Sequence, residues 1–281
     1  MLVELKGLYK LGRPLTSLTG SLAVLLGGYV AGTGNWRAIG LAVVATFLIS
    51  MAANAWNDYL DIEIDRINQP QRPLPSGQVR LRSALLFSFV LTLLALFITF
   101  FINWPAFIIA VGSAVLLYMY SWRLKSTVLF GNCTIAIISA MSAIFGGVAA
   151  GNVWPSLWLA TIIFSAIMGR EILKTLADYE GDLRQHCRTI STVWGRRPAR
   201  IVFFLMGAVT ILTMMLPYIF QVYRPIYAII VALGVFPVLL YVVTKVTRYR
   251  TGPQLERLSQ LMKYDFLIWF LAVFLGANVA A

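Results

Sequence analysis

The sequence predicts an all-α membrane protein, and three observations support that fold class. The 281 residues are 59% hydrophobic with a mean hydropathy of +0.80, which is more apolar than an ordinary soluble domain. Apolar runs long enough to cross a bilayer as helix recur along the whole chain. Basic residues are concentrated in alternate connections between these runs. We therefore expect a single polytopic membrane domain over residues 1–281.

Nine transmembrane helices are expected, because nine apolar runs have about the length that spans a hydrocarbon core. The first run is expected to stay in the protein, since no small-residue cleavage motif follows it and a second run begins at once. The fourth is the shortest, and a tight hairpin joins it to the third. The expected helices are Leu15–Ala31, Ala38–Trp56, Ser83–Ile102, Pro105–Tyr120, Val128–Ala150, Trp154–Lys174, Ile201–Phe220, Pro225–Val246 and Tyr264–Ala280.

The basic residues indicate how the chain is oriented. All 23 Lys and Arg residues except Arg37 and Arg224 fall in the N-terminal arm or in the even-numbered connections. Positive charge in short loops marks the cytoplasmic side. We expect a multi-pass protein of the cell (inner) membrane, with the N-terminus and active-site loops in the cytoplasm and the C-terminus outside. The net charge of +12 therefore reflects topology, and neither a nucleic acid nor a protein partner is indicated.

Metal sites built from sulfur or imidazole are not expected. Cys133 falls in a predicted helix and Cys187 in a loop, so the two cysteines do not suggest a disulfide or a shared metal ion. His186 is the single histidine of the chain. These counts exclude a zinc or haem site of the usual kinds.

Eight of the eleven acidic residues fall in two short segments, although an unpaired carboxylate near a bilayer is costly. The first segment ends the second predicted helix and reads Asn54-Ala-Trp-Asn-Asp-Tyr-Leu-Asp-Ile-Glu-Ile-Asp65. Asn57, Asp61 and Asp65 recur every four residues, so a helix would align their oxygens on one face. Carboxylate and amide oxygens are the ligands that Mg²⁺ prefers.

The second segment ends the sixth predicted helix and reads Arg170-Glu-Ile-Leu-Lys-Thr-Leu-Ala-Asp-Tyr-Glu-Gly-Asp182. Asp178 and Asp182 have the same helical spacing. Gly181 favours an end to the helix, which would leave Asp182 on a loop. Because the second and sixth helices end on the same side, we expect both acidic segments at the cytoplasmic face.

Two carboxylate groups that hold two or three metal ions suit a diphosphate leaving group. Metal and basic side chains neutralise the departing oxygens, so the carbon–oxygen bond of an allylic diphosphate can break toward a carbocation. Arginine matches the geometry of phosphate. The candidate diphosphate-binding residues are Asn54, Arg72, Arg123, Lys125, Lys174 and Arg188.

The two segments resemble the signatures of the UbiA superfamily of intramembrane prenyltransferases, N-D-x-x-D-x-x-x-D and D-x-x-x-D. The resemblance covers the whole chain and implies a bundle of nine helices around a central cavity, with cytoplasmic cap loops. It also implies that Mg²⁺ bridges a prenyl diphosphate to the motif residues. The implied metal ligands are Asn57, Asp58, Asp61, Asp65, Asp178 and Asp182, and the five aspartates are the implied catalytic residues.

In this family the isoprenoid tail would occupy an apolar tunnel open toward lipid. Aromatic side chains near the motifs could then face the allyl cation through cation–π contact. The candidates for the substrate cavity are Trp56, Tyr118, Tyr120 and Tyr179.

The resemblance implies a membrane-associated acceptor, and the motifs are most similar to the branch that transfers geranylgeranyl to geranylgeranylglyceryl phosphate in ether-lipid synthesis. An aromatic acceptor of the 4-hydroxybenzoate, homogentisate, naphthoate or chlorophyllide type is the alternative. An ion-coupled transporter is the non-enzyme alternative, but transport carboxylates usually lie near the middle of the bilayer. Both acidic segments are expected at the interface instead.

Overall fold

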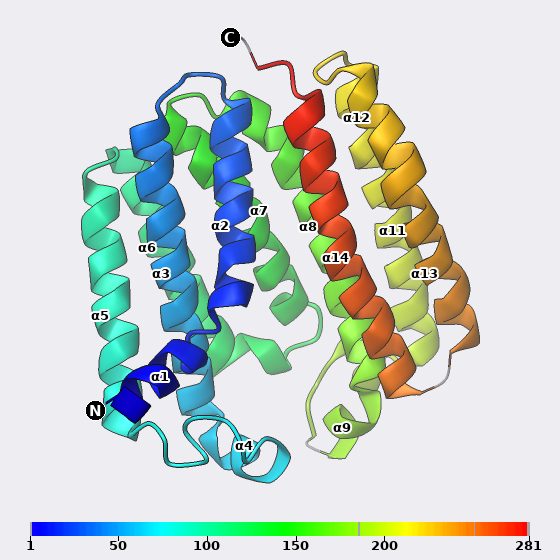
Figure 1. Ribbon diagram of the computed structural model, residues 1–281. Coiled ribbons are helices and arrows are strands. Elements are labelled where there is room, and N and C mark those ends of the chain that lie inside the picture. Colours follow the sequence, from blue (N-terminus) through cyan, green and yellow to red (C-terminus); the bar gives the residue numbers. More distant parts are fainter. Residues whose placement is uncertain (1, 185, 250, 280–281) are drawn as a thin grey trace. The chain divides into compact units, whose positions relative to one another are not determined.

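The computed structural model describes residues 2–184, 186–249 and 251–279, and its regular structure within these ranges is helical (Figure 1). The chain forms two compact units. Unit 1 comprises Met1–Leu124 and Met141–Ser156, and unit 2 comprises Lys125–Ala140 and Leu157–Ala281.

Unit 1 contains the N-terminal helices and the second half of α7. Two of its long helices begin directly after an asparagine, whose side chain accepts a hydrogen bond from the backbone N–H three residues further on. Asn35 accepts from Ala38 at 3.3 Å, and Asn103 accepts from Ala106 at 2.8 Å. The helices are α1 (Leu2–Leu11), α2 (Pro14–Val30), α3 (Trp36–Leu60), α4 (Ile62–Asn68), α5 (Leu81–Phe100), α6 (Trp104–Trp122) and α7 (Phe130–Ala150).

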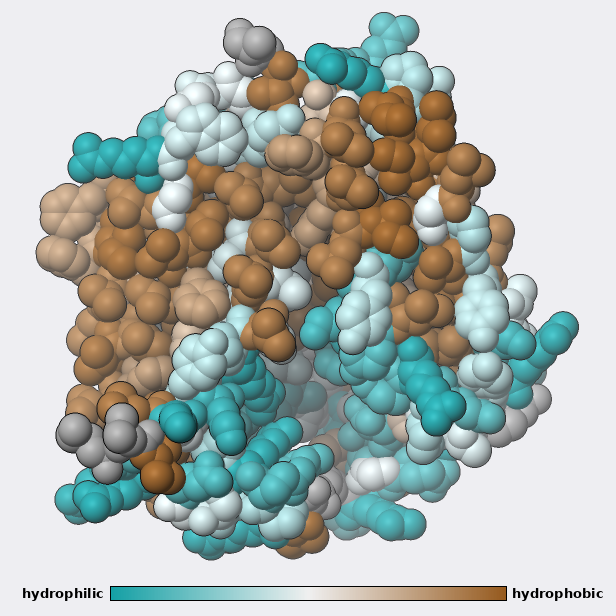
Figure 2. Space-filling view, in the orientation of Figure 1, coloured by the Kyte–Doolittle hydropathy of each residue, from teal (hydrophilic) through white to brown (hydrophobic). Residues whose placement is uncertain are grey.

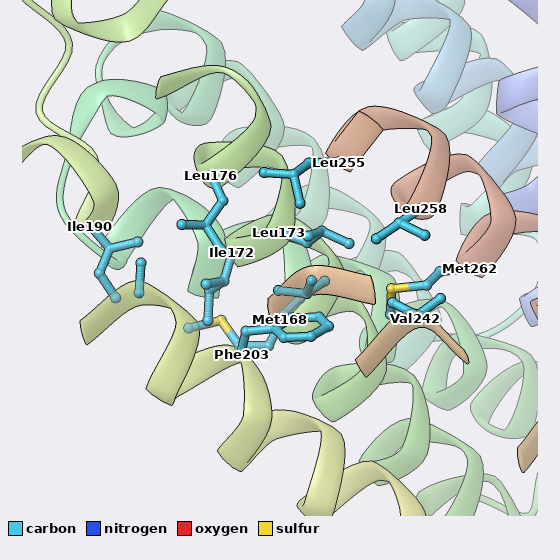
Figure 3. Close-up of a cluster of buried hydrophobic side chains, with 13 residues drawn as sticks. Met168, Ile172, Leu173, Leu176, Ile190, Phe203, Val242, Leu255, Leu258 and Met262 are labelled. Carbon is cyan, nitrogen blue, oxygen red and sulfur yellow. The ribbon is translucent and has the colours of Figure 1, made fainter. Parts of the chain in front are cut away.

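Unit 2 contains the first half of α7 and the remaining helices, which include one π-helical segment, η2, between α12 and α13. Its buried apolar cluster joins residues of α8, α11, α13 and α14, and Figure 3 shows Met168, Phe203, Val242 and Met262 meeting there. The elements are η1 (Leu124–Ser126), α8 (Trp154–Ala177), α9 (Tyr179–Arg184), α10 (Ile190–Val193), α11 (Arg196–Ile219), α12 (Pro225–Ile230), η2 (Val231–Val235), α13 (Phe236–Arg248) and α14 (Gly252–Gly276).

The helices agree with the predicted membrane spans in place. Among the described residues, eight helices are long and apolar enough to cross a membrane, with Pro225–Arg248 counted as one. The first expected span corresponds to α2, which at 17 residues is shorter than each of these eight helices. The fourth expected span, Pro105–Tyr120, corresponds to α6, which is longer than that span at 19 residues.

The last helix begins earlier than predicted. The expected start was Tyr264, but α14 begins at Gly252 because Thr251 and Gln254 form a capping box there. The polar residues that follow extend the helix by about three turns before the apolar part begins. The predicted last residue of this span, Ala280, lies outside the described residues.

Hydrophobic and hydrophilic residues occupy different parts of the surface of each unit. In Figure 2 the visible surface over α5 of unit 1 is hydrophobic, whereas hydrophilic residues gather over α1 and α4. Exposed side chains of α5 include Leu86, Leu93 and Phe97. In unit 2, hydrophilic residues gather around α9. The ends that carry the acidic segments are therefore polar, whereas the exposed surface of α5 is apolar.

Candidate active site

The first acidic segment keeps its helical alignment although the helix is interrupted. α3 ends at Leu60 and α4 begins at Ile62, with Asp61 between them. The backbone N–H of Asp61 still donates to Asn57 O at 3.0 Å, and that of Asp65 donates to Asp61 O at 2.8 Å. The predicted spacing of one acidic or amide residue per turn therefore survives the break.

Two of these aspartates are buried and paired with arginines. Asp58 and Asp65 are 2% and 5% exposed. Arg72 Nη1 lies 2.6 Å from Asp65 Oδ2 and 3.5 Å from Asp58 Oδ1. Arg13 also donates to Asp58 Oδ1. The two guanidinium groups offset the cost of holding two carboxylates close together.

The other polar groups of the segment differ in exposure. Asn57 Nδ2 donates to Asp61 Oδ2 at 3.0 Å. Glu63 and Arg66 form a pair at 2.8 Å, with side chains 76% and 55% exposed. Such a surface pair contributes little to stability. Glu63 is thus separated from the buried carboxylates, in agreement with its absence from the predicted ligand set.

The Asn54 side chain forms hydrogen bonds with the junction between α1 and α2. Its Nδ2 donates to Gly12 O at 3.0 Å and to Ser17 Oγ at 3.2 Å. Ser17 Oγ in turn donates to Gly12 O at 3.0 Å. This network links α3 to the N-terminal helices, so the side chain predicted to bind diphosphate has a structural role in this arrangement.

The second acidic segment also keeps its hydrogen-bonded turns. Asp178 N–H donates to Lys174 O and Asp182 N–H donates to Asp178 O, both at 2.8 Å. The helix breaks at Asp178 rather than at Gly181, which lies inside α9. Asp182 is therefore on a helix and not on a loop, because the short helix tolerates the glycine near its middle.

Electrostatics at Asp182 make its carboxyl easier to protonate than that of an ordinary aspartate. Desolvation and the neighbouring Asp178 carboxylate raise the pKa of Asp182 to about 6, although a hydrogen bond from the Thr189 side chain lowers it. A divalent cation would remove this repulsion between carboxylates.

Lys174 pairs with an acid of its own helix. Its Nζ lies 3.0 Å from both carboxylate oxygens of Glu171, which is 6% exposed. Arg170 Nη1 lies 3.6 Å from the same carboxylate. Glu171 is thus neutralised within α8, and Lys174, with a side chain 37% exposed, stays at the surface of unit 2.

The predicted cavity aromatics of unit 1 pack together. Trp56 Nε1 donates to Tyr118 O at 3.3 Å, and the ring centroids of the two residues lie 5.1 Å apart. The Tyr118 hydroxyl is 2.6 Å from Ser88 Oγ and 2.8 Å from Thr92 Oγ1. Tyr120, two residues further along α6, is half-buried.

The remaining predicted residues lie near the polar ends of the units. In unit 2, the Arg196 guanidinium lies 4.1 Å above the Tyr179 ring. In unit 1, exposed Arg123 follows α6. Half-buried Lys125 lies in η1, and exposed Arg188 lies between α9 and α10.

The donor set fits a hard cation such as Mg²⁺. The aligned groups are carboxylates and one amide, and none is a thiol or an imidazole. Within the described ranges, no three Asp, Glu, His or Cys side chains lie close enough to hold a metal ion by themselves. Mg²⁺ sites commonly combine one or two carboxylates with water and substrate phosphate.

Sequence reasoning missed Arg13 as a site residue and treated it as a topology charge. Arg13 has a left-handed backbone, with φ 49° and ψ 61°, between α1 and Pro14 of α2. This conformation is uncommon for a non-glycine residue. The sole signal in the sequence was a basic residue directly before the proline that starts the first apolar run.

Comparison with known proteins gives consistent matches over nearly the whole chain. The model of the UbiA prenyltransferase family matches residues 19–276. A digeranylgeranylglyceryl phosphate synthase of Thermococcus sibiricus is 32% identical, over 96% of this chain and 97% of that protein.

Two solved structures resemble this fold. One, from work on digeranylgeranylglyceryl phosphate synthase in membranes, has a TM-score of 0.82 at 30% identity and covers 97% of this chain and 98% of its own. The other is a UbiA homolog from Archaeoglobus fulgidus bound to GPP and Mg²⁺. It has a TM-score of 0.72 at 18% identity and covers 95% of this chain and 99% of its own.

Proposed function

The chain belongs to the UbiA prenyltransferase family and is a multi-pass membrane prenyltransferase, and we propose that it transfers a geranylgeranyl group from its diphosphate to geranylgeranylglyceryl phosphate. This reaction adds the second hydrocarbon chain to an ether lipid. The proposal takes its acceptor from the synthase to which the chain is 32% identical over nearly its full length.

The observation that supports this function most directly is the pair of hydrogen-bonded acidic turns. Asn57, Asp61 and Asp65 are linked by backbone bonds of 3.0 and 2.8 Å, and Asp178 and Asp182 by one of 2.8 Å. We assign Mg²⁺ and the diphosphate to these residues together with Asp58. Bound Mg²⁺ would neutralise charge on the departing diphosphate oxygens.

Arg72 and Arg13 contact the carboxylates of the first acidic segment that are proposed to bind Mg²⁺. Together they pair with Asp58 and Asp65 and offset part of the repulsion between the two carboxylates. The Arg72 side chain is about one-third exposed, and we propose that its guanidinium also contacts a phosphate oxygen. Lys174, Arg123, Lys125 and Arg188 are proposed to add positive charge near the diphosphate.

We further propose a cell-membrane protein with its acidic turns at the cytoplasmic face and its C-terminus outside. All 23 basic residues but Arg37 and Arg224 lie in the segments assigned to that face. The polar ends of both units carry the acidic segments, which supports the same assignment.

The test is Mg²⁺-dependent product formation by the purified protein with geranylgeranyl diphosphate and a panel of acceptors. The panel contains geranylgeranylglyceryl phosphate, 4-hydroxybenzoate, homogentisate and a naphthoate. Asp61→Asn and Asp182→Asn are expected to lower turnover by about 10²-fold or more, as when a charge-stabilising group is removed.

Matched controls come from the same segments. Glu63→Gln and Glu180→Gln each change a carboxylate whose side chain is more than 70% exposed and paired with a surface arginine. Both variants should keep wild-type turnover. Product with an aromatic acceptor alone would overturn the ether-lipid assignment, and equal loss in all four variants would overturn the site.

A further inference from the structure

The outer face of α1 carries basic and apolar side chains next to one another. Lys6 and Lys10, about one helical turn apart, are both exposed. Val3, Leu5 and Tyr9 are 67%, 56% and 61% exposed, although their side chains are largely apolar. With ten residues, α1 is about 15 Å long, which is too short to cross a bilayer. This helix therefore presents a surface of mixed character outside the packed core of unit 1.

The opposite face of α1 is fixed to the rest of unit 1. Leu11 is 1% exposed and belongs to a buried cluster with Ala55 of α3 and Ala84 of α5. The Glu4 carboxylate accepts a hydrogen bond from Ser83 Oγ at 2.7 Å, at the start of α5. An apolar contact and a polar contact thus hold α1 in one orientation, and they determine which residues face outward.

α1 is held close to the first expected membrane span. Figure 1 shows α1 lying obliquely beside the end of α3 and the start of α5. Two residues, Gly12 and Arg13, separate it from α2, so the outer face of α1 cannot move far from the bilayer. Leu15 and Leu18, directly after this junction, are 82% and 46% exposed. The apolar residues on α1 therefore continue an apolar surface that begins on the span.

An exposed tryptophan marks the same end of unit 1. Asn54, near the end of α3, donates to Gly12 O in the α1–α2 junction, and Trp56 packs against Tyr118 of α6. About one turn further along, α6 ends at Trp122, which is 62% exposed. Tryptophan is enriched where a membrane meets water. α1 consequently lies at the end of the unit where the interface is expected.

Exposed basic residues at this end come from two segments. Lys6 and Lys10 belong to α1, whereas Arg80 and Arg82 lie at the start of α5. The Glu4 carboxylate also accepts from the backbone N–H of Arg80 at 3.4 Å, so the two segments are neighbours. Glu4 is the single acidic residue of α1. The surface therefore has a net positive charge beside apolar groups, the combination that favours an anionic membrane surface.

We propose that the outer face of α1, together with the start of α5, binds the head groups of anionic phospholipids. Lys6 and Lys10 contact lipid phosphate, and Leu5 and Tyr9 insert between the head groups. A lysine can bury its carbon chain along apolar surface while its ammonium group stays at the level of the phosphates. None of these residues belongs to the proposed metal or diphosphate site, so the inference is independent of the proposed function.

An acidic soluble protein fits this surface less well. The two-residue junction with α2 keeps α1 beside the bilayer, where lipid head groups are always present. A soluble partner would have to displace those head groups and cover apolar side chains that lipid already covers. The charge also selects among lipids, because a zwitterionic head group offers the two lysines no net negative charge.

The experiment measures hydrogen–deuterium exchange of α1 in the full-length protein, reconstituted as single copies into two kinds of nanodisc. One contains phosphatidylcholine alone, and the other contains phosphatidylcholine mixed with phosphatidylglycerol. The peptide that covers α1 should exchange more slowly in the anionic nanodisc, by roughly fivefold for each lysine that contacts the surface. High salt should remove the difference, because it screens exposed charges. Inorganic phosphate added to the phosphatidylcholine nanodisc should not reproduce it.

Paired substitutions distinguish the lysines from charge in general. Lys6→Gln combined with Lys10→Gln should abolish the difference between the two nanodiscs. Arg37→Gln combined with Arg224→Gln is the matched control, which removes the same charge from the side opposite the proposed cytoplasmic face and should keep the difference. Leu5→Gln combined with Tyr9→Gln should speed exchange of α1 in both nanodiscs, because the inserted side chains are then polar.

Equal exchange of α1 in the two nanodiscs would overturn the proposal, as would a difference that survives the lysine substitutions or high salt. Loss of the difference in the Arg37 and Arg224 control would also overturn it, since net charge alone would then explain the effect. Slow exchange that requires two protein copies per nanodisc would assign this face to a second copy of the chain instead. The salt comparison uses the unmodified protein, so it decides the question if a lysine variant fails to fold.

Discussion

Arg13 and Asp58 are 45 positions apart in the chain, yet the Arg13 guanidinium donates a hydrogen bond to the Asp58 carboxylate. Asp58 is 2% exposed, so the positive charge of Arg13 offsets a buried negative charge in the first acidic segment. The contact also ties the α1–α2 junction to the end of α3. A residue of the N-terminal arm thereby becomes part of the proposed active site.

We predict that Arg13→Ala lowers both activity and stability. Asp58 would keep only Arg72, whose Nη1 is 3.5 Å away. The free energy of unfolding should fall by about 1–3 kcal/mol, the usual cost of leaving a buried charged group underpaired. Denaturant unfolding in detergent measures this. Arg37→Ala, an exposed basic residue of α3, is the control and should leave both quantities unchanged.

Asn54 and Asn57 should respond differently to alanine. Asn54→Ala removes the donor to Gly12 O and Ser17 Oγ, so it should cost about 1–3 kcal/mol of stability and leave the KM for the prenyl diphosphate nearly unchanged. Asn57→Ala should instead raise the Mg²⁺ concentration needed for half-maximal turnover. A rise in diphosphate KM without loss of stability in Asn54→Ala would support the diphosphate-binding role predicted from sequence.

Close packing of α2 against α7 gives a third prediction. A Cβ atom on Gly27 would lie 2.0 Å from Ala143 O, and one on Gly146 would lie 2.0 Å from Val24 O. Small residues allow membrane helices to approach this closely. Gly27→Ala should therefore lower the unfolding free energy by about 1–3 kcal/mol through overpacking. Gly40→Ala, where nothing lies within 4 Å, should be neutral; equal loss in both variants would contradict the packing argument.

Asp182 should make stability depend on pH in the metal-free protein. Its folded pKa of about 6 lies above the ordinary value of 3.8, so the folded state binds the proton more tightly than the unfolded state. Stability from this group therefore falls as the pH rises from about 4 to 6 and then stays low. Asp182→Asn should remove that slope. Thermal unfolding in EDTA between pH 4 and 8 measures it, and an unchanged slope in the variant would refute the assignment.

The membrane class and the position of the helices followed from the sequence because hydrophobic length is a local property. The apolar runs agree in place with the helices, and the acidic spacing of four residues persists through the break at Asp61. The family resemblance was confirmed by the match over residues 19–276. Helix ends were predicted less well, since the capping box at Thr251 starts α14 twelve residues early.

The sequence by itself determined the class, the spans and the two acidic motifs, because each depends on neighbouring residues and a fixed helical period. Only the tertiary structure decided which partners those residues have. Arg13 reaches Asp58, Asn54 reaches the α1–α2 junction, and Glu4 reaches Ser83, all through packing between segments distant in the chain. Such contacts depend on how whole helices meet, and no local pattern encodes that geometry.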